Sequence, residues 1–384
     1  MGLARNSKIA KTTPLTPGSG IGSTIYPTRA VRLTFSAALR RPQLSDMAAI
    51  PNLLTGLRGG SRGRGRGRGQ ANIPGFSDAS SINPATRFPR SEQAIRATDT
   101  DAAVSRLSAV CAGYLEDPFA EHFVEAASAT RRLPIINRGT YTRTSAIDRL
   151  VDLFLAGSGE RQIVSLGAGT DTRAFRLRAR GERVLYHEFD FPDICAVKKS
   201  RVDAGAIVKL IDKQDGLTDY HIHSLDLRTI AGKEATDFEG LRINIPTLVI
   251  SECCLCYLKV EITEEVIQWF IKRMPSLSII LYEPIRVDDP FGQQMVENLA
   301  SRGVVMPTVQ KYRTLKDQEE RLAKLAFVGV SSESTDKIWD RWIDEDEKER
   351  VNALEGLDEV EEWNLLASHY AVIWGWTDES IFQK

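Results

Sequence analysis

Hydrophobic residues follow two different spacings along most of this chain, and the two spacings alternate. Residues 133–155 carry apolar side chains at helical spacing, at Ile147, Leu150, Val151, Phe154 and Leu155. Short apolar runs follow, separated by turns or by further helical stretches such as Glu261–Met274. Because strands that alternate with helices are typical of a parallel sheet covered on both faces, the pattern predicts an α/β fold.

About seven strands and several helices are expected from these spacings. The predicted strands are Gln162–Leu166, Val184–Phe189, Tyr220–Leu225, Thr247–Ser251, Ser278–Tyr282, Ala326–Val330 and Tyr370–Trp376. The predicted helices are Asp99–Tyr114, Phe119–Thr130, 133–155, Glu261–Met274 and 291–299, with a solvated acidic helix face over Ile343–Arg350. Parallel sheets of this kind bind ligands at the carboxyl ends of their strands, so a site is expected there.

Residues 1–90 show no such pattern and are rich in Gly, Pro, Ser and Arg, which predicts a disordered tail before a folded domain at 91–384. The tail holds 14 Arg and Lys against two acids, whereas the remaining 294 residues hold 36 basic and 49 acidic groups. An acidic body disfavours general nucleic-acid binding, which rests on Lys and Arg. Any such contact is therefore expected from the Arg-Gly repeat at 59–70.

The tail has three further interpretations. One is that the tail serves only to keep the protein soluble. Its first 45 residues carry no acid, which is also typical of a mitochondrial transit peptide. Met47 is an alternative start of the chain.

The cysteines bear on the compartment. There are five, an odd number, and three of them (Cys253, Cys254 and Cys256) are clustered at one predicted strand. This favours reduced, buried thiols and a cytoplasmic or nuclear protein over a secreted one. No run of 18 apolar residues occurs, so neither a transmembrane helix nor a membrane partner is expected, and no metal site is predicted.

Glycines and carboxylates stand at the carboxyl ends of successive predicted strands. Gly167 follows the first strand, Asp190 the second, Asp226 the third and Glu252 the fourth. Asp190 lies 23 residues beyond Gly167, close to the distance at which an acid accepts a ribose hydroxyl in nucleotide-binding folds. Its alternative role is to cap a helix that begins at Pro192.

The glycine turn distinguishes between two classes of cofactor. A dinucleotide fingerprint reads G-x-G-x-x-G, but here Thr172 replaces the third glycine and Asp171 lies within the turn. That carboxylate would repel a pyrophosphate at a helix N-terminus. S-adenosyl-L-methionine carries a sulfonium and an ammonium and no phosphate, so the turn favours it. The carboxylate of this cofactor would need a cation such as Arg143 or Arg138.

Five separated motifs resemble the leucine carboxyl methyltransferase family. They are INRGTYTRTSAID, IVSLGAGTDTRAFRL, HEFDFP, PTLVISECCLCYL and YEPIRVDDPFGQQMVENL, and the resemblance extends over residues 92–378. It implies a class I methyltransferase fold, with a seven-stranded, mostly parallel sheet and added helices that form a substrate lid. It also implies methyl transfer from S-adenosyl-L-methionine to the C-terminal leucine α-carboxylate of the protein phosphatase 2A catalytic subunit, which regulates holoenzyme assembly.

The resemblance assigns residues to the cofactor. They are Arg106, Arg143, Gly167, Asp190, Asp226, Leu227 and Glu252. Arg143 corresponds to the arginine that pairs with the cofactor carboxylate, Asp190 to the acid that binds the ribose, and Glu252 to the acid near the methionine part. Asp226 and Leu227 correspond to the pair beside the adenine. Arg106 stands where some members of the family carry lysine, and the two side chains differ in geometry.

The implied reaction needs few catalytic groups. A C-terminal carboxylate is ionised at pH 7 and the leaving thioether is neutral, so no general base or acid is required. We therefore expect no catalytic His or Cys. Tyr257 and Tyr282 are candidate donors that would orient the substrate carboxylate.

Other functions are open at this point. A tRNA carboxyl methyltransferase of wybutosine synthesis, or a small-molecule carboxyl methyltransferase, would use the same domain. A cofactor-binding adaptor recruited through the Arg-Gly tail would need no catalysis at all. For the leading interpretation we expect a monomer that contacts the C-terminal tail of the phosphatase.

Overall fold

A seven-stranded sheet runs through the computed structural model, which describes residues 90–211 and 219–378. The strands are β1 (Gln162–Leu166), β2 (Leu185–Asp190), β3 (Tyr220–Ser224), β4 (Thr247–Glu252), β5 (Leu277–Pro284), β6 (Gly329–Ser334) and β7 (Tyr370–Trp376). Their order in the sheet is β3-β2-β1-β4-β5-β7-β6. The first five pair in parallel, and β7 is antiparallel to both of its neighbours. The expectation of a seven-stranded, mostly parallel α/β fold is confirmed.

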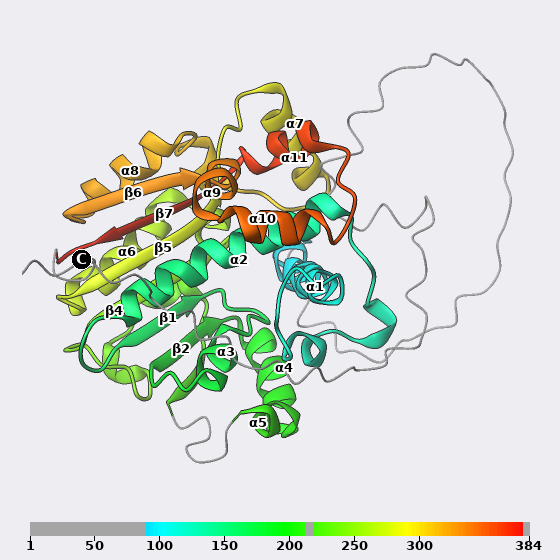
Figure 1. Ribbon diagram of the computed structural model, residues 1–384. Helices are drawn as coiled ribbons and strands as arrows, with labels where there is room; N and C mark the ends of the chain where they lie inside the picture. Colours follow the sequence, from blue (N-terminus) through cyan, green and yellow to red (C-terminus); the bar gives the residue numbers. More distant parts are fainter. Residues whose placement is uncertain (1–89, 212–218, 379–384) are drawn as a thin grey trace, which may run out of the picture. The chain divides into compact units, whose positions relative to one another are not determined.

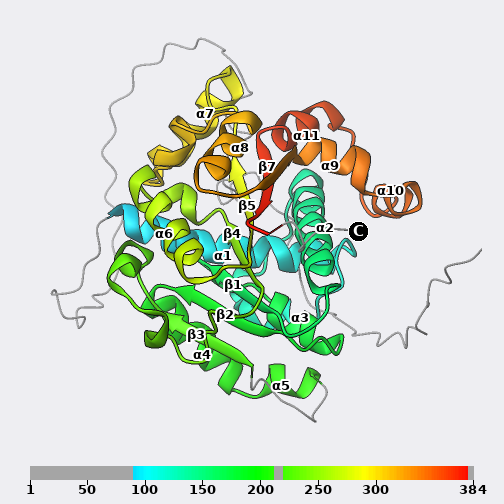
Figure 2. The ribbon, with the colours of Figure 1, turned by 90° about the vertical axis from the view of Figure 1, so that its left-hand side faces the viewer.

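The helices cover both faces of this sheet (Figure 2). They are α1 (Arg90–Cys111), α2 (Pro134–Leu155), α3 (Arg173–Ala179), α4 (Pro192–Asp203), α5 (Ala206–Leu210), α6 (Val260–Arg273), α7 (Pro290–Ser301), α8 (Leu315–Lys324), α9 (Thr335–Trp342), α10 (Glu345–Asn352) and α11 (Val360–Ala367). Helices α2, α3, α4 and α9 pack on one face, and α6 and α8 pack on the other. Because both faces are covered, β1 is buried along its whole length. The predicted tail lies outside the described residues, apart from Arg90.

The predicted helix over Phe119–Thr130 is wrong. The segment forms two short 3-10 turns, η3 (Ala120–Phe123) and η4 (Ala126–Ser128), joined by extended backbone. Phe119 and Phe123 pack against Phe175 of α3, with ring centroids 5.8 and 5.9 Å apart. A longer helix would have no apolar stripe to bury beyond these two rings, and an isolated short helix is unstable in water.

The sixth strand was predicted too early in the chain. Residues 326–328 precede the strand, and Ala326 has a left-handed φ of 71° that ends the turn after α8. The observed strand pairs with β7 from Gly329 opposite Trp376 to Ser334 opposite Ala371. Its sequence, GVSSES, is mostly polar because β6 lies at the edge of the sheet, so it lacks the apolar run used to find the other strands.

Several helices gather at the carboxyl ends of the parallel strands. Figure 1 shows α1, α7 and α11 on this side of the sheet. Helix α1 begins nine residues earlier than predicted, and its added part crosses the loops that follow β1, β2 and β3. No helix within the described ranges is long and apolar enough to cross a membrane.

Candidate functional site

A cavity of about 970 Å³ lies at the carboxyl ends of the central strands. Its walls come from the strand-end loops, from α1 and α2, and from the segment that joins α7 to η8 (Pro307–Gln310). All seven predicted cofactor residues line it: Arg106, Arg143, Gly167, Asp190, Asp226, Leu227 and Glu252. Both candidate tyrosines, Tyr257 and Tyr282, line it as well. The structure therefore brings the whole predicted set together.

The glycine turn after β1 is held by the acid that ends β2. Gly167 has a left-handed φ of 61°, and a Cβ there would lie 2.5 Å from the sulfur of Cys254. Asp190 accepts hydrogen bonds from the amides of Gly169 and Phe191, both at 2.7 Å. It makes no side-chain cap on α4, so the alternative capping role is wrong. Burial raises the pKa of Asp190, although these two amides oppose the shift.

Asp171 occupies the start of α3, where a dinucleotide-binding protein would place a phosphate. Its carboxylate accepts from the backbone amide of Arg173 at 3.1 Å and from the guanidinium of the same residue at 2.6 Å. Burial alone would raise its pKa, but Arg173 and Arg106 lower that pKa to about 2. A negative charge is thus fixed at this helix terminus, which argues against a bound pyrophosphate.

An ion-pair network beneath the cavity is centred on Arg173, which is only 1% exposed. Its Nε donates to Asp148 at 2.9 Å, and its Nη1 donates to Glu252 at 2.8 Å. Glu252 in turn accepts from Nε of Arg143 at 2.7 Å. Burial would raise the pKa of Glu252, but the two guanidiniums lower it. Because Arg143 meets Glu252 through Nε, its two terminal nitrogens are the ones that can reach a ligand in the cavity.

The other predicted carboxylate is also neutralised by a neighbouring arginine. Asp226 accepts from the amide of Arg228 at 3.0 Å and from its Nε at 2.9 Å. Arg106 lies within 3.4 Å of Asp117 and 3.8 Å of Asp171. Several carboxylates around the cavity are therefore paired with arginines, so the cavity is not uniformly acidic.

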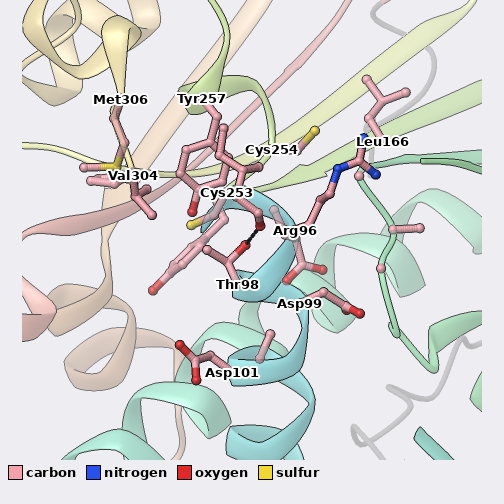
Figure 3. A pocket seen from close by; sticks show the side chains of 18 of the residues that line it. Arg96, Thr98, Asp99, Asp101, Leu166, Cys253, Cys254, Tyr257, Val304 and Met306 are labelled. Atoms are coloured by element: carbon pink, nitrogen blue, oxygen red, sulfur yellow. Dashed lines mark hydrogen bonds between the residues drawn. The ribbon is translucent and has the colours of Figure 1, made fainter. Parts of the chain in front are cut away.

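Helix α1 contacts the strand-end loops through side chains about one turn apart, and Figure 3 shows two of them, Arg96 and Asp99. Glu92 accepts from Arg228 at 2.8 Å, and Asp99 accepts from the amide and hydroxyl of Thr170 at 2.7 and 2.8 Å. Arg96 pairs with Asp193 and lies 3.9 Å from the ring centroid of Phe191. The spacing of four and three residues places these side chains on one face of the helix. We call Glu92, Arg96 and Asp99 the α1 clamp.

The two tyrosines occupy different positions in the cavity wall. Tyr257 lines the cavity together with Thr98 of α1 (Figure 3). Tyr282 is stacked on Tyr370 with ring centroids 5.5 Å apart, and Arg143 lies over its ring at 4.6 Å. Tyr257 is therefore the better placed of the two to donate to a substrate, while Tyr282 supports Arg143.

The structure decides between the two candidate arginines for a ligand carboxylate. Arg138 lies outside the cavity wall and stacks over Trp339 and Trp363, at 4.7 and 5.4 Å. Its guanidinium donates to Asn352 at 2.5 Å. Of the two candidates, Arg143 is therefore the one that lines the cavity and can bind a ligand carboxylate.

Sequence reasoning missed several residues that hold the site. Arg173, Asp99 and Lys198 were given no role, although Lys198 donates to the carbonyl oxygen of Asp171 at 2.8 Å. Lys198 also pairs with Glu188 at 2.5 Å, and both side chains are almost fully buried. One signal was available, because Glu188 is a charged residue inside an apolar strand, and a buried charge requires a partner. No group of three residues that could hold a metal occurs in the part of the chain that the structure describes.

Comparisons with known proteins assign the chain to a family. A family model described as leucine carboxyl methyltransferase matches residues 94–271. Leucine carboxyl methyltransferase 1 of Aspergillus fumigatus is 45% identical over 373 residues, which is 85% of this chain and 93% of the relative. The chain belongs to the leucine carboxyl methyltransferase family. It is thus an S-adenosyl-L-methionine-dependent methyltransferase.

More distant members of the leucine carboxyl methyltransferase family align over most of the same region. The leucine carboxyl methyltransferase 1 homolog of Arabidopsis thaliana is 34% identical over 300 residues, or 74% of this chain and 90% of that relative. Among solved structures, phosphoethanolamine N-methyltransferase 2 of Haemonchus contortus is 14% identical, with a TM-score of 0.45 over 77% of this chain and 60% of that one.

The cavity of this leucine carboxyl methyltransferase family member has groups that suit the carboxylate, the ribose and the base of S-adenosyl-L-methionine. The terminal nitrogens of Arg143 suit a carboxylate, and Asp190 retains lone pairs for a ribose diol. Leu227 offers a buried apolar contact beside Asp226, which suits a base with an exocyclic amino group. The start of α3 is already satisfied by Asp171, so a phosphate is neither needed nor accommodated.

Proposed function

We propose that this chain methylates the α-carboxylate of the C-terminal leucine of the protein phosphatase 2A catalytic subunit. The observation that carries the proposal is that polar strand-end residues and an apolar segment after α7 line one cavity. Arg143, Asp190 and Glu252 are among the polar residues, and Leu299, Val304 and Met306 are among the apolar ones. The apolar residues suit a leucine side chain, and the polar residues suit the methyl donor.

S-adenosyl-L-methionine supplies an electrophilic methyl group on a sulfonium sulfur. The chain's own residues have three tasks, which are to hold the two reactants in line, to orient the substrate carboxylate and to exclude water. Arg143 would hold the donor's carboxylate, and Glu252, fixed by Arg173, would keep Arg143 in place. Alignment of two bound reactants can supply roughly 7–11 kcal/mol of the barrier.

The substrate carboxylate requires a donor and a dry environment. Tyr257 lines the cavity, and its hydroxyl can donate to a carboxylate oxygen. Burial raises the pKa of Tyr257 well above its ordinary value, so the hydroxyl keeps its proton at neutral pH. The α1 clamp covers the strand-end loops and restricts the access of water to this point.

The substrate claim is tested with tritiated S-adenosyl-L-methionine and purified phosphatase catalytic subunit. Label is expected on the intact subunit and not on the same subunit without its last leucine. Equal labelling of the two would disprove the leucine-carboxylate assignment. Labelling of bulk tRNA in place of the phosphatase would support the tRNA alternative.

The cofactor assignment is tested separately by calorimetry with S-adenosylhomocysteine. Asp190→Ala is expected to weaken binding by about tenfold or more, because a hydrogen bond to a charged group contributes about 1.5–3 kcal/mol. The matched control is Asp203→Ala, which removes an exposed carboxylate from the far end of α4 and should leave the affinity unchanged. An unchanged affinity in Asp190→Ala would show that the ribose does not bind there.

A further inference from the structure

The proposed methyl transfer does not use the cysteine thiols that follow β4. Cys253 and Cys256 stand at C-x-x-C spacing in the turn after β4, Cys253 directly after the strand and Cys256 within η7 (Leu255–Tyr257). This turn also carries two cavity residues, because Glu252 immediately precedes the first thiol and Tyr257 immediately follows the second. A change in the turn would therefore act directly on the cavity.

The two thiols differ in their access to the cavity. Cys253 is partly exposed and lines the cavity wall beside Tyr257 (Figure 3). Its φ of 51° is unusual for a residue with a side chain, and its amide donates to the carbonyl oxygen of Tyr282 at 2.9 Å. Cys256 is fully buried beneath it, in an apolar cluster that includes Met295 and Met306. Cys253 packs against this same cluster.

The surroundings make the two thiols chemically unequal. Interaction with Cys256 and the positive charge of Arg143 lower the pKa of Cys253, against burial and the charges of Glu283 and Glu252. Burial and the interaction with Cys253 raise the pKa of Cys256 well above its ordinary value. A partly exposed thiol with a lowered pKa beside a buried partner is the arrangement found at redox-sensitive cysteine pairs.

We propose that Cys253 and Cys256 form a dithiol that hydrogen peroxide oxidises to a disulfide, and that this disulfide disables methyl transfer. The Cys253 sulfur attacks one peroxide oxygen, the O–O bond breaks, and a sulfenic acid and one water form. The Cys256 sulfur then attacks the sulfenic sulfur, and the S–S bond forms as a second water leaves. Two electrons pass from the sulfur pair to the peroxide, and the two thiol protons end in the two waters.

The disulfide acts on the cavity because a disulfide demands a fixed geometry of the residues that it joins. Bonding to Cys256 draws the Cys253 sulfur away from the cavity wall and towards the buried cluster. The backbone between the two residues must then rearrange. Glu252 and Tyr257 move with it, so the support of Arg143 and the proposed substrate donor are both displaced.

The test uses the full-length protein treated with hydrogen peroxide. Peptide mapping by mass spectrometry is expected to find a Cys253–Cys256 disulfide, seen as a peptide mass lower by two hydrogens. A dithiol reductant should restore both thiols and the original mass. S-adenosylhomocysteine affinity and methyl transfer are expected to fall in proportion to the oxidised fraction and to recover on reduction. Mapping and cofactor affinity do not require the phosphatase substrate, so failure of this proposal is distinguishable from failure of the proposed substrate.

Two variants and an internal control sharpen the test. In Cys256→Ala, oxidation is expected to stop at a sulfenic acid on Cys253, because no second thiol is in reach. Dimedone would trap this sulfenic acid. Cys111→Ser removes the exposed thiol of α1 and should leave disulfide formation and its effect unchanged. The neighbouring Cys254, whose pKa burial raises, should remain reduced under the same treatment. Free thiols at Cys253 and Cys256 after treatment, or a disulfide that leaves cofactor affinity and activity unaltered, would each overturn the proposal.

Discussion

At the scale of single residues, the site depends on a side chain that the sequence analysis passed over. Arg173 touches Asp148, Asp171 and Glu252 from one buried position, and these carboxylates come from three separate parts of the chain. Burying this guanidinium is tolerable only because all three partners are present. Arg173 therefore supports the cavity from below and is not itself part of the cavity wall.

Replacing Arg173 with methionine should be strongly destabilising. Removal of one partner leaves buried carboxylates without a counter-charge, which costs about 3–5 kcal/mol in the free energy of unfolding. Arg173→Lys keeps a charge but loses the bridging geometry, so an intermediate loss is expected. Chemical denaturation of the purified variants measures both effects.

The matched control lies on the same part of the chain. Arg180 pairs with Asp152, but their side chains are 48% and 51% exposed. Arg180→Met should change the free energy of unfolding by less than about 1 kcal/mol, because exposed ion pairs contribute little. Similar losses in Arg173→Met and Arg180→Met would show that burial does not set the strength of this network.

At the scale of elements, α1 joins its clamp residues to the loops after three successive strands. Its hydrophobic pattern is weak in this part, because the residues that make contact are Glu92, Arg96 and Asp99. This first part of the helix is therefore held at the strand-end loops by polar contacts, and we expect these contacts to keep the cavity closed.

Asp99→Ala should loosen α1 without unfolding the sheet. The amide and hydroxyl of Thr170 lose their acceptor, so hydrogen exchange in residues 90–105 should accelerate. S-adenosylhomocysteine affinity should fall about tenfold, as expected for loss of a charged hydrogen-bond acceptor. Unchanged exchange in α1, with core strands exchanging faster instead, would contradict the clamp.

Three histidines of β2 and β3 form a stack near one edge of the sheet. The rings of His187, His221 and His223 lie parallel, with centroids 5.0 to 6.2 Å apart. Burial, reinforced by His223, lowers the pKa of His187 to about 2. Burial, reinforced by His221, lowers the pKa of His223 to about 4. Both rings are therefore neutral in the folded protein across the mildly acidic range.

Stability should accordingly fall as the pH drops below about 6.5. The unfolded chain binds protons at the ordinary histidine pKa of about 6.5, whereas the folded chain does not bind them until the pH is much lower. Each such proton costs about 1.4 kcal/mol per pH unit. Urea unfolding between pH 7.5 and 5 should show this slope, and His187→Leu/His223→Leu should flatten it. Parallel pH profiles in the wild type and the double variant would refute the assignment.

At the scale of the whole molecule, the site is contained in the part of the chain that begins with α1. The first residue that lines the cavity among the described residues is Ser91. The contacts that form the proposed cofactor site all join residues that follow Ser91 in the chain.

Two truncations locate the start of the functional unit. A chain without residues 1–89 is expected to keep its cofactor affinity and its activity on free phosphatase. A chain without residues 1–105 loses the α1 clamp and should lose cofactor binding, although the sheet remains intact. Calorimetry, activity assays and circular dichroism of both proteins check this. Loss of activity in the shorter deletion would assign a role in catalysis to the tail.

The sequence by itself determined the sheet and the edge at which the site forms. Strands such as β1 and β4 were found because apolar runs and helical spacing are local properties of the chain. Gly167, Asp190 and Glu252 then follow from their positions at strand ends, because parallel strands bring their carboxyl ends to one edge. The polar edge strand β6 had no such pattern, and its pairing with β7 fixed its position.

Only the tertiary structure decided which charges meet. Asp99 reaches Thr170 across 71 positions, Arg173 reaches Glu252 across 79, and Arg143 reaches Glu252 across 109. The choice of Arg143 over Arg138 likewise depends on which face of α2 meets the cavity. Local patterns cannot specify such pairs, because the free energy of a buried charge depends on the partners that the completed fold brings within a few ångströms of it.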